Sequence, residues 1–250
     1  MSVKTSVFNF QKFSVIQNSA AMRITTDSVL LGSWASQFIG LRNAVLDVGT
    51  GTGIVSLIMA MRSPHAKFHA IDIEKGAAAE ADLNFKSSPW SDRLSCEQTD
   101  FREYKAKNKF DVIVSNPPYF EPGCQTGSLI RQIARSYKTL SPQELMSAAA
   151  ANLISSGQLV IIVPVSNLKS FSAAAEAVHL FPLKMLYISG RKGITPYAVL
   201  ILFKKIMNKD AAPVQPEIAY GAVREEGDFY TRFYYEMTKD LYLWKNKQTA

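Results

Sequence analysis

The chain has 250 residues, of which 47% are hydrophobic and 20% are charged. This size and composition predict one moderately large globular domain with a substantial core. No apolar run approaches the length of a membrane span, and the first residues lack the apolar core of a signal peptide, so we expect a soluble, cytoplasmic protein. Lys and Arg outnumber Asp and Glu by 28 to 21, and this net charge of +7 favours an anionic partner such as nucleic acid.

The two cysteines, Cys96 and Cys124, have neither clustered histidines nor the C-x-x-C spacing of a zinc or redox site. We therefore expect structural thiols and no bound metal. The sequence has no internal repeat, which argues against a repeat protein.

Strand-like and helix-like segments begin to alternate near residue 43. Short hydrophobic runs predict buried strands, and longer runs with helical spacing predict the helices between them. The first four strands are expected over 43–49, 66–73, 93–100 and 109–116, and the first two helices over 53–62 and 74–87.

The following segments continue the alternation and then break it. A helix is expected over 141–156, with Ser141 as N-cap, Pro142 in the first turn and Glu144 completing a capping box. A fifth strand begins after Gly157, and a helix over 167–179 follows. The last strands, 183–189 and 198–205, are too close for a helical crossover and should pair antiparallel. The sequence therefore predicts a doubly wound α/β fold, a mostly parallel seven-stranded sheet with a carboxyl-terminal antiparallel hairpin.

The two ends of the chain differ from this pattern. Residues 8–17 alternate like a strand or hairpin, and residues 25–38 predict a helix with Thr26 or Asp27 near its amino terminus. We expect residues 1–40 to form an extension that packs on the main domain, residues 41–250. After a linker-like segment over 206–217, an aromatic-rich helix is expected over 228–244.

The glycine-rich segment "VLDVGTGTG" (45–53) joins the first expected strand to the first helix. Glycines let the backbone approach a ligand closely, and the helix amino terminus offers unpaired N–H groups. A dinucleotide loop would have its third glycine at Ile54, and the Asp47 carboxylate fits badly with a pyrophosphate. Asp47 would instead attract a cationic amino group, and the loop residues assigned to the same site are Gly49, Thr50 and Gly51.

Acidic residues also end the second and third expected strands. Asp72 lies where a carboxylate can accept hydrogen bonds from both hydroxyls of a ribose. Asp100 and Phe101 suit an adenine, with the carboxylate on the exocyclic amine and the ring on the face of the base. Together with Asp47 these features describe S-adenosylmethionine, and Ile73 is assigned to the same pocket. The pattern resembles the class I methyltransferases, whose Rossmann-like sheet also ends in an antiparallel hairpin.

The segment "SNPPYF" (115–120) ends the fourth strand with prolines that cannot continue a sheet. It resembles the NPPY motif of methyltransferases that modify planar nitrogens, in which the lone pair of the NH2 group is delocalised and the nitrogen is a poor nucleophile. Asn116 and the Pro117 carbonyl would each accept one amine hydrogen and so aim the lone pair at the methyl group. Tyr119 would stack on the base.

Longer blocks resemble the bacterial tRNA1(Val) adenine N6-methyltransferases, and this resemblance covers nearly the whole chain. It rests on the amino-terminal block (8–34), "SPWSDR" (88–93), "NPPYFEPG" (116–123) and "RQIARSYKTL" (131–140). It implies transfer of a methyl group to N6 of the adenine just 3′ of the anticodon in a valine tRNA, with S-adenosylmethionine as cofactor.

The resemblance also implies roles for residues outside the cofactor loop. Thr26 and Asp27 match a Thr-Asp pair that would border the cofactor pocket, although Arg23, Ile24 and Thr25 before them depart from the commoner residues. The substrate contacts it implies are Pro118, Phe120, Arg131 and Arg135.

Three alternatives stay open from the sequence. A protein glutamine N5-methyltransferase would share NPPY, although those enzymes usually carry a separate helical domain before the core. The amine could also be N2 of a guanine in RNA, or the chain could bind RNA without catalysis. A monomer is expected, with a weak dimer as the alternative.

Overall fold

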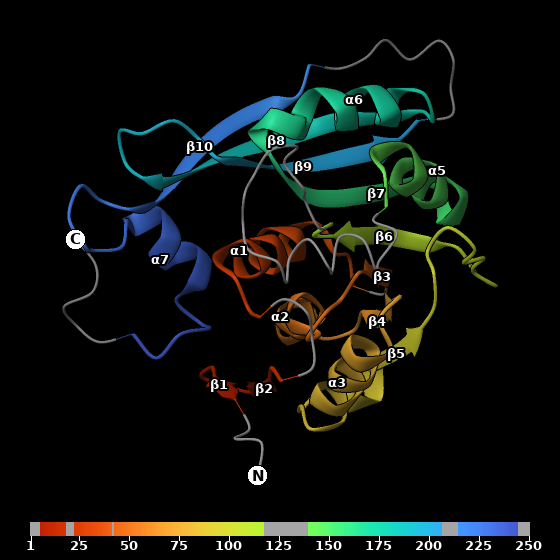
Figure 1. Ribbon diagram of the computed structural model, residues 1–250, viewed down its shortest axis with the longest axis horizontal. Coiled ribbons are helices and arrows are strands. Elements are labelled where there is room, and N and C mark those ends of the chain that lie inside the picture. Colours follow the sequence, from red (N-terminus) through yellow and green to blue (C-terminus); the bar gives the residue numbers. More distant parts are fainter. Residues whose placement is uncertain (1–5, 19–22, 42, 118–139, 207–214, 245–250) are drawn as a thin grey trace, which may run out of the picture.

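The computed structural model describes residues 6–18, 23–41, 43–117, 140–206 and 215–244. At its centre is one eight-stranded sheet with the order β10-β8-β9-β7-β6-β3-β4-β5, and helices cover both faces of it (Figure 1). A separate two-stranded hairpin near the amino terminus packs against one of these helical layers.

The bounds of the elements follow the expected alternation. The strands of the sheet are β3 (Ala44–Val48), β4 (Lys67–Asp72), β5 (Leu94–Gln98), β6 (Phe110–Ser115), β7 (Leu153–Pro164), β8 (Leu180–Arg191), β9 (Ala198–Lys205) and β10 (Glu217–Arg224). The helices are α1 (Thr26–Ala35), α2 (Ile54–Arg62), α3 (Lys75–Lys86), α5 (Pro142–Asn152), α6 (Leu168–Glu176) and α7 (Arg232–Thr238), with short 3-10 turns η1 (Ser36–Phe38), η2 (Ser91–Arg93) and η3 (Val165–Asn167).

The strand pairing confirms the predicted mostly parallel sheet and its antiparallel hairpin. β3 to β7 pair parallel, whereas β9 runs antiparallel to both β7 and β8. The sheet has one strand more than the seven expected, because β10 adds parallel to the free edge of β8. β10 escaped prediction because its first four residues are exposed and Gly221 interrupts the pattern, so it lacks a continuous apolar face.

Among the helices, α5 and the last helix differ most from the predicted bounds. α5 begins at the expected Ser141 capping box but stops at Asn152, where the expected helix continued to residue 156. The Asn152 side chain caps this end by donating to the Ala148 carbonyl, and β7 begins at the next residue. The last helix is only α7, because the chain turns back after Thr238.

The amino-terminal segment forms the expected hairpin, β1 (Val7–Asn9) with β2 (Ser14–Ile16), followed by α1. The N-cap of α1 is Thr25, so Thr26 and Asp27 open its first turn. Every residue of α1 from Ser28 to Ala35 is buried, as is typical of a helix that is apolar on all sides. The division of the chain at residue 40 stays a prediction, but α1 lies inside the main core.

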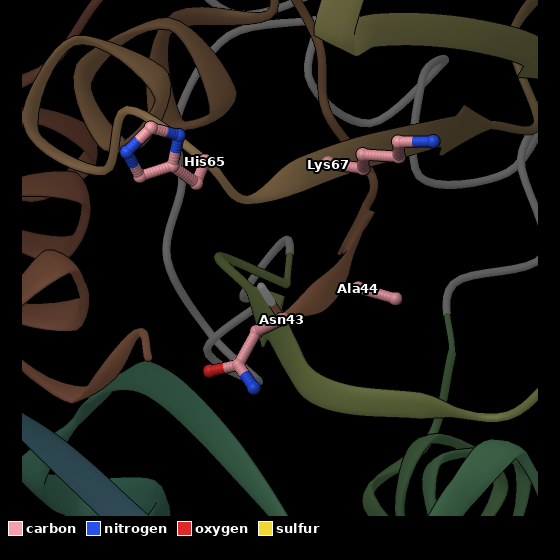
Figure 2. A pocket seen from close by; sticks show the side chains of 4 residues that line it. All are labelled: Asn43, Ala44, His65 and Lys67. Carbon is pink, nitrogen blue, oxygen red and sulfur yellow. The ribbon is translucent and has the colours of Figure 1, made fainter. Parts of the chain in front are cut away.

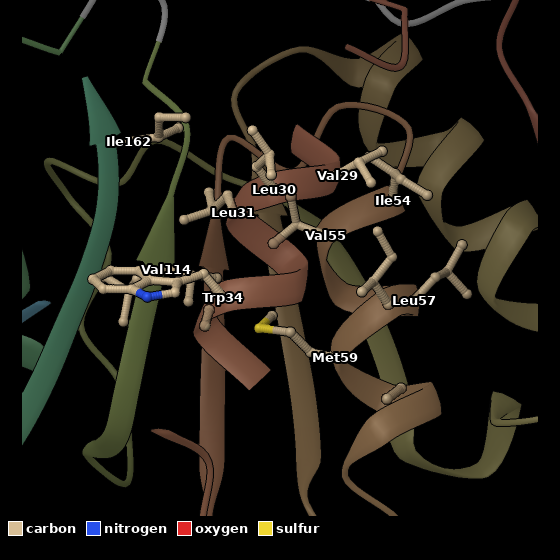
Figure 3. Packing of buried hydrophobic residues seen from close by; sticks show 14 of the residues in the cluster. Val29, Leu30, Leu31, Trp34, Ile54, Val55, Leu57, Met59, Val114 and Ile162 are labelled. Carbon is tan, nitrogen blue, oxygen red and sulfur yellow. The ribbon is translucent and has the colours of Figure 1, made fainter. Parts of the chain in front are cut away.

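α1 and α2 pack side by side over the centre of the sheet (Figure 3). Val29 and Leu31 of α1 and Val55 of α2 belong to one buried cluster with Val114 of β6 and other strand residues. A second cluster on the opposite face joins the sheet to α5 and α6. The sheet is therefore buried on both faces, as its nearly continuous apolar strands require.

Candidate active site

The parallel strands bring the predicted site residues to one edge of the sheet, the edge at their carboxyl ends. Ser115 pairs with Val48, and Val48 pairs with Ile71. The residues that follow these three, Asn116, Gly49 and Asp72, therefore stand in one row. The Ser115 hydroxyl donates to the Val48 carbonyl (2.9 Å), which ties the ends of β6 and β3 together. Open parallel sheets bind their ligands at this edge.

The glycine loop keeps its backbone accessible. Gly53, the N-cap of α2, has φ +82°, and a Cβ there would lie 2.5 Å from the Phe85 ring, so this position requires glycine. Gly49 and Gly51 also have positive φ, but open space lies where their side chains would stand. The loop and the first N–H groups of α2 can therefore approach a ligand closely.

Asp47 is buried beneath this loop, with 2% of its surface exposed. Its Oδ2 accepts hydrogen bonds from the Thr50 hydroxyl (2.7 Å) and the Ser56 hydroxyl (2.8 Å). Burial raises the pKa of Asp47 to about 6, although these hydrogen bonds act in the opposite direction. The carboxylate thus fixes the loop, and its predicted contact with a ligand ammonium stays a prediction.

Asp72 ends β4 beside the loop and is only partly buried. Its Oδ2 accepts from the Gly51 N–H and its Oδ1 from the Glu74 N–H, each at 2.9 Å. Burial raises the pKa of Asp72, and the two backbone hydrogen bonds lower it. The backbone therefore fixes the orientation of this carboxylate at the edge of the sheet.

The predicted adenine contacts lie just after β5. Both Asp100 oxygens accept from the Arg102 guanidinium, with distances of 2.9 and 3.0 Å to Nε. Phe101 is 3% exposed and belongs to the core, whereas Ile73 is 40% exposed. Ile73, which follows β4, is thus the accessible apolar side chain of the predicted pocket. The contact of Phe101 with a base stays a prediction.

Asn116 and Pro117 are the last described residues before a gap at 118–139. Asn116 is half-buried and Pro117 is buried, and both follow directly from β6. The other residues predicted for catalysis or substrate contact lie outside the described residues, so their roles stay predictions: Pro118, Tyr119, Phe120, Arg131 and Arg135. The same holds for Cys124.

Tyr197 reaches the site from the loop between β8 and β9, and no sequence pattern singled it out. Its hydroxyl donates to Oδ1 of Asp27 at 2.6 Å, across 170 residues of chain. Thr26 is exposed beside Asp27 in the same turn. The structure therefore connects the predicted Thr-Asp pair to the carboxyl-terminal hairpin.

A hollow of about 340 Å³ lies at the opposite edge of the sheet (Figure 2). Asn43, Ala44, His65 and Lys67 line it, at the amino ends of β3 and β4. None of the predicted site residues is among them. This hollow is therefore separate from the candidate active site.

The described ranges contain no group of three or more His, Cys, Asp or Glu side chains placed to hold a metal ion. Nor does any helix in them have the length and apolar character to cross a membrane.

Solved structures share this fold. A protein of Agrobacterium tumefaciens, described as a predicted O-methyltransferase, matches with a TM-score of 0.64 and 20% identity over 88% of this chain and 100% of that one. The tRNA m1G37 methyltransferase of M. jannaschii matches with a TM-score of 0.60 and 15% identity over 83% and 59%. At these identities the likeness shows the class I methyltransferase fold alone.

Comparison of sequences identifies the family. The methyltransferase small domain model matches residues 26–179, so the chain is a methyltransferase of this class. The tRNA1(Val) (adenine(37)-N6)-methyltransferases of Bacteroides thetaiotaomicron and Phocaeicola vulgatus are each 36% identical to it, over 94% of this chain and 97% of theirs. That of Flavobacterium johnsoniae is 33% identical over 95% and 99%. The chain belongs to the tRNA1(Val) (adenine(37)-N6)-methyltransferase family.

Proposed function

We propose that the protein transfers a methyl group from S-adenosylmethionine to N6 of adenine 37 in tRNA1(Val), the reaction for which its relatives are named. The place of Asn116 carries the proposal. It follows β6 in the same row as Gly49 and Asp72, so its side chain and the glycine loop belong to one edge of the sheet. A planar amine held at Asn116 would thus lie beside a cofactor held by the loop.

The residues of this edge fit S-adenosylmethionine. Each Asp72 oxygen accepts one backbone N–H, and its remaining lone pairs suit the ribose hydroxyls. The open backbone of the glycine loop and the start of α2 suit the carboxylate of the amino-acid part. Ile73, Asp100 and Phe101 would hold the adenine. When bound, the cofactor supplies an electrophilic methyl group on a sulfonium.

Asn116 and Pro117 would prepare the amine for attack. The Asn116 side-chain oxygen and the Pro117 carbonyl each accept one hydrogen of the N6 amine, which makes the nitrogen pyramidal and frees its lone pair. Alignment of this kind contributes about 7 to 11 kcal/mol in the best oriented reactions. The lone pair would form the bond to the methyl carbon while the methyl–sulfur bond breaks and its electrons stay on sulfur, so that the thioether S-adenosylhomocysteine leaves. The nitrogen is then cationic, so the N6 proton departs afterwards to water and no strong base is required beforehand.

The positive charge of the chain suits a tRNA substrate, since phosphate contacts supply much of the affinity for nucleic acids. Two cations at the end of β8 and the start of the following loop already have acidic or carbonyl partners. Lys192 pairs with Glu225 at 3.3 Å, and Arg191 donates to the Glu225 carbonyl at 3.3 Å. Lys12 and Arg23, exposed cations of the amino-terminal extension, are therefore the better candidates for phosphate contact.

Methyl transfer to defined RNA tests this function. Labelled S-adenosylmethionine is supplied with an unmodified tRNA1(Val) transcript, and the nucleosides are then separated. We expect label in N6-methyladenosine, and none in a transcript with guanine at position 37. Label in N2-methylguanosine, or only in added protein, would contradict the proposal and favour one of the alternative substrates.

A further inference from the structure

Tyr197 is held firmly at the carboxyl edge of the sheet. Its N–H donates to the Ile188 carbonyl of β8 (2.9 Å), and its own carbonyl accepts from the Val165 N–H just after β7 (3.0 Å). β9 begins at the next residue. The backbone of Tyr197 is therefore fixed between the ends of β7 and β8 and the start of β9.

The hydroxyl of Tyr197 meets a carboxylate that is fixed from the other side. Asp27 lies in the first turn of α1, where Thr25 and Ser28 form a reciprocal capping box. The 2.6 Å distance from the Tyr197 hydroxyl to Oδ1 of Asp27 is typical of an O–H donor bound to an ionised carboxylate. Within the described residues, Oδ2 of Asp27 accepts no hydrogen bond.

This pair lies beside the cofactor loop. α1 packs on α2, and Figure 3 shows Val29 next to Ile54, the first residue after the glycine loop. α1 also contacts β7, whose Ile162 stands in the same row as Asn116. α1, which carries Asp27, thus packs against α2, which follows the glycine loop, and against β7, which lies beside the strand that precedes Asn116.

We propose that Tyr197 is a positioning residue for methyl transfer: its hydroxyl holds the Asp27 carboxylate so that Oδ2 binds a cationic group of S-adenosylmethionine. This inference rests on the proposed function and adds a residue to it. S-adenosylmethionine carries an ammonium and a sulfonium, and an ionised, oriented carboxylate is complementary to either.

The surroundings make this role sensitive to pH. Burial raises the pKa of Asp27, and the hydrogen bond from Tyr197 lowers it, so the hydroxyl helps to keep the carboxylate ionised. Burial, and then the neighbouring Asp27 charge, raise the pKa of Tyr197, so its hydroxyl keeps its proton and remains a donor.

Other charged groups on the packed elements act elsewhere. Arg62 of α2 donates to the Ser33 carbonyl, at the far end of α1. Tyr234 of α7 is hydrogen-bonded to Tyr242. Arg23, before α1, is exposed. Within the described part of the chain, Tyr197 is thus the titratable group that bonds to Asp27.

Calorimetric binding of S-adenosylmethionine between pH 5 and 9 tests the inference. The proteins are wild type, Tyr197→Phe, Asp27→Asn and the double variant. Without the hydroxyl the pKa of Asp27 rises, so Tyr197→Phe should move the loss of affinity at acid pH to higher pH. It should weaken binding about 3- to 30-fold at pH 7. Asp27→Asn should remove the part of the acid-side loss of affinity that comes from Asp27 and leave any part from Asp47 and Asp72, whose pKa values burial also raises. The double variant should match Asp27→Asn.

Tyr187→Phe is the matched control, since Tyr187 lies in β8 stacked on Tyr220; it should bind like wild type at every pH. Thermal melts verify that each variant folds. The inference would be overturned if Tyr197→Phe lost affinity for S-adenosylmethionine at the same acid pH as wild type. It would also be overturned if the losses of affinity in the two single variants added in the double variant. Either result would leave the proposed function intact. A folded wild-type protein that binds no S-adenosylmethionine would overturn both.

Discussion

Asp47 illustrates how much of a residue's role depends on what surrounds it. Its place before the glycines predicts a charge near a ligand, but Thr50 and Ser56 turn their hydroxyls onto it and bury it. Tyr197 is the converse case. It stands in a polar loop without any motif, and its partner Asp27 is 170 residues away, so no local pattern could reveal it. Motif spacing therefore predicted Asp47 as a site residue but not its hydroxyl partners, which are three and nine residues away, and it gave no sign of the long-range contact of Tyr197.

The buried carboxyl of Asp47 predicts a specific pH dependence of stability. Its pKa is about 6 in the folded protein against an ordinary value of 3.8, so the folded state binds more protons between these values. The free energy of unfolding should therefore fall as pH rises from about 4 to 6, by about 3 kcal/mol for this group, and then level off.

Urea unfolding of wild type and Asp47→Asn across this range isolates the effect. Asparagine keeps an oxygen for the two hydroxyls but does not titrate, so wild type should lose stability relative to the variant only between pH 4 and 6. If the free energy of unfolding changed with pH in the same way in both proteins, the burial of Asp47 would have no effect on the pH dependence of stability.

Among the elements, the mostly parallel sheet and the antiparallel hairpin could be predicted, because short apolar runs alternating with helices and the brief β8–β9 connection determine them. β10 could not, since an exposed edge strand lacks the apolar alternation of a buried one. The end of α5 could not be predicted either. It depends on the Asn152 side chain, which donates to the Ala148 carbonyl and accepts from the Ala106 N–H, 46 residues earlier in the chain.

Asn84 of α3 joins the amino-terminal hairpin to the cofactor loop. It is 1% exposed, pairs with both the N–H and the carbonyl of Ile16 (2.8 and 2.9 Å), and donates to the Thr52 carbonyl (2.9 Å). Asn84→Ala leaves these backbone groups without their partner, so we expect a loss of about 2 to 4 kcal/mol in the free energy of unfolding.

The same variant should bind S-adenosylmethionine more weakly, because Thr52 lies within the glycine loop. Lys86→Ala serves as the control on α3, since this exposed side chain should change stability by no more than about 0.5 kcal/mol. If the free energy of unfolding of Asn84→Ala fell by less than about 1 kcal/mol, other contacts would hold the hairpin and the loop together.

At the scale of the whole molecule, segments near both ends of the chain pack together on one side of the sheet. Gln11 of the hairpin donates through its side chain to the carbonyls of Lys239 and Tyr242, and the Phe10 and Tyr242 rings stack 5.7 Å apart. The sequence shows that both segments are rich in aromatic residues. Their contact could not be predicted, because it joins residues more than 200 positions apart. The candidate active site is thus formed by central strands of the sheet, and segments from both ends of the chain pack beside it.

In the proposed reaction, Asn116 acts on the amine while the neighbouring loop and Asp72 hold the cofactor. Asn116→Ala separates these roles, and Asn108→Ala, an exposed asparagine before β6, is its control. We expect Asn116→Ala to bind S-adenosylmethionine like wild type but to lose methyl transfer to tRNA1(Val) by at least about 100-fold, since orientation of the amine is lost. Undiminished transfer by Asn116→Ala would contradict this role of Asn116.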